Sequence, residues 1–150
     1  MSEKQCPIPI WPRWLGAGGA LPFLILGVLS WVDWQAQAQV QFALLAYGAC
    51  ILSFVGALHW GFAMTANGLD EAQRSRLYVW SVVPSLVAWV ALVLPPAWGA
   101  ATLVAGLWGH YLQDRRLAAH LVLPDWYLPL RLALRGAASL GLLLAWPTLA

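Results

Sequence analysis

The stretch VQFALLAYGACILSFVGALHWGFAM, residues 40–64, decides the fold of this chain. It contains no Asp, Glu, Lys or Arg. At a rise of about 1.5 Å per residue, a helix of this length exceeds the roughly 30 Å of hydrocarbon in a bilayer. The stretch therefore predicts a transmembrane helix. Small residues recur along it at every fourth position and predict a face where another helix packs closely; they are Ala49, Ser53, Ala57 and Gly61.

The composition of the whole chain points to the same class of protein. Of its 150 residues, 61% are hydrophobic and 9% are charged, whereas a soluble domain usually carries about a quarter charged residues. Too little of the chain remains between the apolar stretches for a separate soluble catalytic domain. We therefore predict an all-α integral membrane protein, a single domain over residues 1–150, with five transmembrane helices packed through small-residue faces. The expected spans are 15–32, 40–64, 77–94, 98–113 and 132–149.

The fourth span is the shortest, and the segment after it is unusual. Ala101, Ala105 and Gly109 repeat every four residues in this span and predict a second packing face. Residues 114–131 read DRRLAAHLVLPDWYLPLR, in which two prolines, a Trp–Tyr pair and arginines occur together. Trp and Tyr prefer the membrane–water interface, and arginines reach lipid phosphates from it. We therefore expect this segment to lie in the plane of the interface.

The basic residues give the predicted topology. With five spans, the N-terminus, the second loop and the fourth loop lie on one side of the membrane, and every Lys and Arg falls there. The positive-inside rule then predicts a cytoplasmic N-terminus and an external C-terminus. The eight residues are Lys4, Arg13, Arg74, Arg76, Arg115, Arg116, Arg131 and Arg135.

Two histidines are the candidates for chemistry. In the predicted topology, His59 in the second span and His110 in the fourth lie at similar depth, one to two helical turns from the inner surface. Two imidazoles at one depth suit ligation of haem iron or a metal, or the sharing of a proton. The alternative is a histidine that hydrogen-bonds a carbonyl, a neighbouring helix or a lipid. Tyr47 and Trp60 are the other polar candidates on the second span.

Other site chemistry has less support in the sequence. The chain contains neither HExxH nor CxxC, so we expect no metal site. Arg131 and Arg135 lie four apart on one helix face and suit an anionic lipid headgroup, as do Arg115 and Arg116; simple anchoring at the interface is the alternative. The predicted spans contain no acidic residue, which argues against an ion-coupled transporter.

Four segments resemble a known family. They are LGAGGALPF near the first span, YGACILSFVGALHWG from Tyr47 to Gly61, WSVVPSLVAW from Trp80 to Trp89, and LPDWYLPLR from Leu123 to Arg131. Together they are similar to a family of small five-span membrane proteins of unknown function, which includes a mitochondrial relative called transmembrane protein sixty-nine. The resemblance covers almost the whole chain. It implies five spans and a multi-pass protein of the bacterial inner membrane, and it implies no activity.

These observations predict a protein without enzymatic activity or a resident cofactor. Its expected role is that of an accessory, assembly or scaffold partner in a membrane complex. The alternatives are a binding protein for haem or quinone near the cytoplasmic side, and a small-molecule transporter or channel. The expected partners are the lipid bilayer, another membrane protein or a second copy of the chain, and no nucleic acid.

Overall fold

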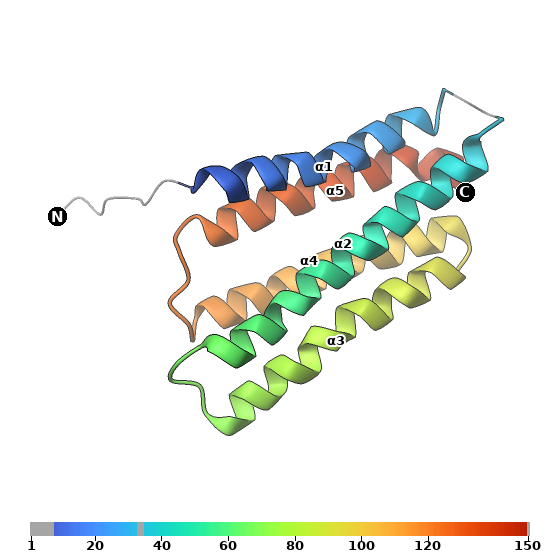
Figure 1. The fold of residues 1–150 in the computed structure, drawn as a ribbon. Helices are drawn as coiled ribbons and strands as arrows, with labels where there is room; N and C mark the ends of the chain where they lie inside the picture. The colour runs from blue at the N-terminus through green and yellow to red at the C-terminus, as the bar shows by residue number, and fades with distance from the viewer. Residues whose placement is uncertain (1–7, 33–34, 150) are drawn as a thin grey trace.

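A computed structural model describes residues 8–32 and 35–149, in which the chain folds into five helices that run side by side and alternate in direction (Figure 1). All five predicted helices are present. Their bounds are α1 Ile10–Leu29, α2 Gln37–Thr65, α3 Glu71–Val93, α4 Pro96–Ala118 and α5 Tyr127–Leu149.

Four helix ends lie well outside the predicted spans, and the first is the start of α1 at Ile10, five residues before residue 15. The helix α3 begins at Glu71 because Asp70 forms a capping box, in which its carboxylate accepts the backbone N–H of Gln73 and the Gln73 side chain accepts the backbone N–H of Asp70. The helix α4 continues five residues past the predicted end at residue 113, and α5 begins five residues before residue 132. The segment 114–131 is therefore not one interfacial unit, since its two ends belong to α4 and α5 and only residues 119–126 connect them.

Four of the helices, α1, α2, α3 and α5, are long and apolar enough to cross a membrane. The helix α4 has 23 residues, as many as α3, but its second half carries the polar run Gln113 to Arg116. The arginines of the described residues gather at one end of the bundle, where α1, α3 and α5 begin and α2 and α4 end (Figure 1). Lys4 lies outside the described residues.

Close packing between helices does use small residues, but at other positions than the sequence predicted. On α2, Ala49 is buried and Ser53 half-buried, whereas Ala57 and Gly61 are exposed. The buried face contains Gly48 and Gly56 instead, one residue earlier, which rotates it by about 100°. On α4, Ala101 is half-buried and Ala105 and Gly109 are exposed. Every-fourth spacing identifies a stripe of small residues, but it does not reveal which way that stripe faces.

The helices α1 and α5 approach each other very closely. A Cβ added to Gly141 would lie 2.4 Å from the carbonyl oxygen of Phe23, and one added to Gly27 would lie 2.6 Å from the carbonyl oxygen of Gly141. Backbone atoms therefore touch where a side chain would otherwise separate the two helices. This contact holds α1 against the rest of the bundle, whose core is formed mainly by leucines of α2, α4 and α5.

Candidate functional site

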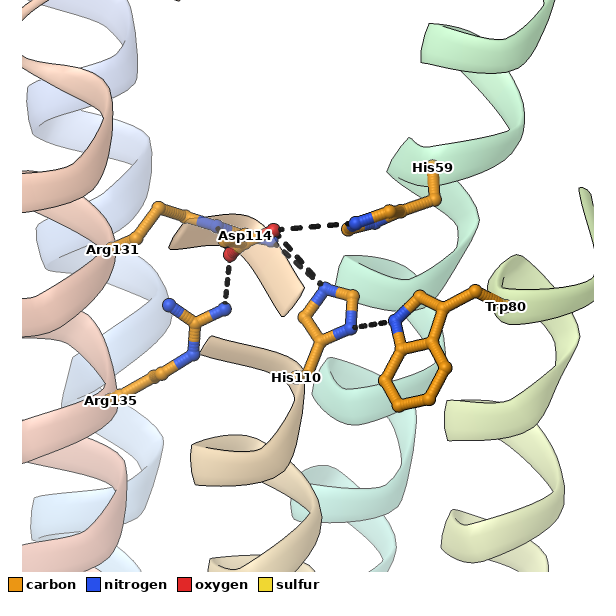
Figure 2. Close-up of polar contacts among 6 residues, drawn as sticks. All are labelled: His59, Trp80, His110, Asp114, Arg131 and Arg135. Atoms are coloured by element: carbon orange, nitrogen blue, oxygen red, sulfur yellow. Dashed lines mark hydrogen bonds and ion pairs between the residues drawn. The ribbon is translucent and has the colours of Figure 1, made fainter. Parts of the chain in front are cut away.

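A carboxylate lies at the centre of the bundle's basic end. Asp114 projects from the last third of α4 and is fully buried. Its Oδ2 accepts hydrogen bonds from Arg131 Nε at 3.2 Å and from Arg135 Nη2 at 2.5 Å. Both arginines come from one face of α5 and are themselves buried (Figure 2). The site thus begins as an ion pair between α4 and α5 in which one acid serves two arginines.

The second carboxylate oxygen faces two histidines. Asp114 Oδ1 lies 3.7 Å from His59 Nε2 on α2 and 3.6 Å from His110 Nε2 on α4. The imidazole rings meet edge to face with centroids 4.7 Å apart. His59 and His110, for which the sequence predicts a similar depth, are thus in contact, and Asp114 lies between them and the arginines (Figure 2).

Trp80 on α3 fixes the tautomer of His110. Its indole Nε1–H donates to His110 Nδ1 at 3.1 Å, and an indole nitrogen is a donor only. His110 Nδ1 must therefore carry a lone pair, so Nε2 carries the hydrogen and points it toward Asp114. The imidazole is neutral in this arrangement. With Trp80, four helices contribute side chains to the cluster of His59, Trp80, His110, Asp114, Arg131 and Arg135, which we call the Asp114 cluster (Figure 2).

Several buried polar atoms in and around the Asp114 cluster have no hydrogen-bond partner within residues 8–32 and 35–149. They are Nε and Nη1 of Arg135, the hydroxyl of Tyr127, both ring nitrogens of His59 and Oδ1 of Asp114. The guanidinium of Arg135 lies over the ring of Tyr111, 5.0 Å from its centroid, and that of Arg131 lies over the ring of Tyr127. An aromatic face attracts a cation but offers no lone pair to its N–H groups. Buried donors without acceptors call for an explanation.

An apolar groove runs beside the cluster. It lies between α1, α2 and α5 and has a volume of about 440 Å³. Leu15 and Phe54, which are strongly exposed, lie on its rim, so the groove opens to the outer surface of the bundle. Its wall is almost entirely apolar, and the residues that line it include Tyr127, Arg131 and Arg135.

The other candidates from the sequence lie apart from the Asp114 cluster. Trp60 is exposed and packs against Tyr78. The hydroxyl of Tyr47 donates to the carbonyl of Gly19 and thereby ties α2 to α1. Arg115 and Arg116 are exposed at the end of α4.

Sequence reasoning missed Asp114. Because the predicted fourth span ends at Gln113, Asp114 falls outside it, and the predicted spans contain no acidic residue. The signal that could have found it is spacing, since His110 and Asp114 lie four residues apart and therefore share a helix face. Asp114 is a buried acid on α4. The absence of acidic residues from the predicted spans therefore no longer argues against a transporter.

Metal and haem ligation fit this geometry poorly. The ligand-type atoms of His59, His110 and Asp114 lie within 4.8 Å of one another. However, the hydrogen on His110 Nε2 occupies the lone-pair position that a metal would need, and Trp80 holds it there. The two arginines on Asp114 repel a cation as well. Imidazoles only 4.7 Å apart leave no space for a porphyrin between them.

Comparison with known proteins places the chain in a family. Residues 8–147 match the family described as protein of unknown function, DUF3429. The chain belongs to the DUF3429 family. It is also 37% identical over 143 residues to a protein of Xenopus tropicalis named Transmembrane protein 69, covering 93% of this chain and 54% of that relative. The chain thus spans about half the length of the curated relative that it matches. No solved structure matches it.

The family assignment confirms the resemblance and the membrane class. The DUF3429 match includes every residue of the Asp114 cluster. The segments that carried the resemblance supply His59, Trp80, Tyr127 and Arg131, so stretches far apart in the sequence meet at this one place. The other members of the cluster, His110, Asp114 and Arg135, come from outside those segments.

Proposed function

We propose that this DUF3429 member binds a single-chain amphiphile in the groove between α1, α2 and α5, with the polar head of the amphiphile at Arg131 and Arg135. The observation that carries this proposal is the composition of the groove wall, which is apolar except for two buried arginines and Tyr127. An apolar pocket with a few converging polar groups is the usual form of a small-molecule site. Its opening at Leu15 and Phe54 suits a ligand that enters from lipid.

The dimensions of the groove favour one hydrocarbon chain. Its lining extends from Pro12 to Phe23 on α1 and from Tyr127 to Ala138 on α5, which corresponds to about 17 Å along each helix at 1.5 Å per residue. This is roughly half the thickness of the bilayer hydrocarbon, the depth of one leaflet. The hydrocarbon tail of one lipid therefore matches the groove in length.

Filling the groove is expected to abolish binding. Ala20→Phe places a ring in the groove, because Ala20 lines it, whereas Ala17 lies one turn earlier on α1 and is exposed. We expect hexadecanoic acid with a photoreactive group in its chain to label groove residues of α1, α2 and α5. Labelling should fall about tenfold or more in Ala20→Phe, since losing the apolar contacts of a few methylenes costs about 1.4 kcal/mol or more.

Ala17→Phe is the matched control and should label like the unmodified protein. Labelled peptides are to be mapped by mass spectrometry in vesicles of neutral phospholipid. Labels spread evenly over all outward-facing helix surfaces, with no difference between the two variants, would contradict the proposal.

A second candidate is the accessory role in a membrane complex, without enzymatic activity of its own. Exposed small residues favour it: Ala57 and Gly61 on α2, and Ala105 and Gly109 on α4, contact little within the chain. In lipid, such surfaces allow the backbone of another helix to approach. We also propose that α4 completes a fifth span, that the basic end faces the cytoplasm of a bacterium, and that the protein lies in the inner membrane.

The accessory role predicts a defined neighbour at these surfaces. With a photoreactive amino acid in place of Ala57, we expect crosslinking in intact membranes to give one discrete product, a second copy or one membrane protein. Placing the same amino acid at the exposed Val79 of α3 is the control and should give none. A product pattern that is identical for the two positions would count against a specific partner.

A further inference from the structure

We infer that the head of the ligand is an anion, a carboxylate or a phosphate, and that it is bound by the unpartnered Nη1 of Arg135 together with the hydroxyl of Tyr127. This inference rests on the proposed binding of an amphiphile in the groove and specifies the chemistry of its head. It follows from the charge of the Asp114 cluster, from its unpartnered donors and from their place in the groove wall.

The Asp114 cluster holds more positive than negative charge. Arg131 and Arg135 carry one positive charge each, and Asp114 is the acid that both of them contact. His110 is neutral because its Nδ1 accepts from Trp80. The balance is one positive charge in excess when His59 is neutral, and two when it is protonated. A buried excess charge is costly unless it is paired, so an anionic head would complete the cluster and a cationic one would be repelled.

The unpartnered donors are those that an anion needs. Arg135 uses only Nη2 on Asp114, which leaves Nε and Nη1 without acceptors. Figure 2 shows one terminal nitrogen of Arg135 turned away from Asp114. The hydroxyl of Tyr127 is also without a partner among the described residues. Both side chains line the groove, and a guanidinium N–H forms a strong, charge-assisted hydrogen bond with an oxygen of a carboxylate or phosphate.

Asp114 acts as a positioning residue in this arrangement. A single oxygen, Oδ2, holds both arginines, while Oδ1 is directed to the histidines on the opposite side. Arg135 is thereby fixed with its remaining N–H groups free, instead of being paired edge-on with the acid. Because Arg135 is already held in one orientation, binding of the head costs less side-chain entropy.

Three probes with similar hydrocarbon chains distinguish the contribution of the head to the affinity from that of the tail. We expect hexadecanoate and lysophosphatidate to bind the protein in neutral nanodiscs about tenfold to hundredfold more tightly than hexadecanol, because a hydrogen bond to a charged group contributes about 1.5–3 kcal/mol. Native mass spectrometry at alkaline pH, where the carboxylate is ionised, measures the three affinities. The two anions distinguish a fatty acid from a phosphate headgroup as the source.

Two conservative variants test the assigned donors. Tyr127→Phe keeps the ring under Arg131 and removes the hydroxyl, and Arg135→Lys keeps the positive charge and removes the Nη1 donor. Each is expected to reduce the preference for anions over hexadecanol by about tenfold, the contribution of one hydrogen bond to an ion. Arg116→Lys, at an exposed position, is the control and should keep the full preference.

The outcomes separate the two proposals. Equal affinities for hexadecanol and hexadecanoate would overturn the anionic head and leave the groove as the binding site. Failure of all three probes to bind would overturn the proposed function itself. An anion preference that persists in both variants would show that the head lies elsewhere.

Discussion

Replacing Asp114 by Asn is expected to destabilise the protein by about 3–5 kcal/mol, the usual cost of removing one partner from a buried ion pair. Asn has nearly the same shape as Asp, so packing around the position is retained. What is lost is the charge that compensates Arg131 and Arg135, both of which stay buried. Unfolding in detergent micelles, followed by far-UV circular dichroism against an increasing fraction of denaturing detergent, measures the effect.

Asp125→Asn is the matched control, because Asp125 is exposed in the loop before α5. This variant should unfold at the same fraction of denaturing detergent as the unmodified protein. The double variant Asp114→Asn with Arg135→Gln removes one unpaired charge and is expected to be less destabilised than the sum of the two single variants. If Asp114→Asn unfolds together with Asp125→Asn, the arginines do not depend on this acid.

The contact between α1 and α5 gives the second large effect. Gly141→Ala is expected to destabilise the protein by about 1–3 kcal/mol or more, the cost of overpacking. The added methyl would lie 2.4 Å from the carbonyl oxygen and 2.6 Å from the carbonyl carbon of Phe23. These are backbone atoms, so no side-chain rotation relieves the clash and α1 must move away from α5.

Gly136→Ala in the same helix is the control. A Cβ at Gly136 meets nothing within 4 Å, and alanine favours a helix over glycine by about 1 kcal/mol. In the same denaturation experiment, Gly136→Ala should therefore be at least as stable as the unmodified protein, and Gly141→Ala should be less stable. The reverse order would mean that α1 and α5 do not pack as closely as their backbones indicate.

Much of the fold could be predicted from the sequence, because whether a segment forms a transmembrane helix depends mainly on the hydropathy of its own residues. A run such as residues 40–64 has only one stable form in hydrocarbon, in which the backbone satisfies its own hydrogen bonds. The presence of five helices could therefore be predicted. Their packing faces could not, since Ala57 and Gly61 form as good a stripe as Gly48 and Gly56. Only the positions of neighbouring helices decide which stripe is buried.

The site could be predicted in part. The similar depth of His59 and His110 follows from counting residues along two helices, and the structure agrees with it. Asp114 could not be found in this way, because a helix boundary drawn from hydropathy stops at the first charged residues. The acid lies inside the bundle only because α5 supplies two arginines to it, and pairing between helices is not visible in the composition of either one.

The dependence of α4 on α5 also bears on how the chain is made. The polar end of α4 has its counter-charges on α5, which is synthesised after α4. We therefore expect α4 and α5 to enter the membrane together as a hairpin. The ion pair between Asp114 and the two arginines then forms only after α5 has been synthesised.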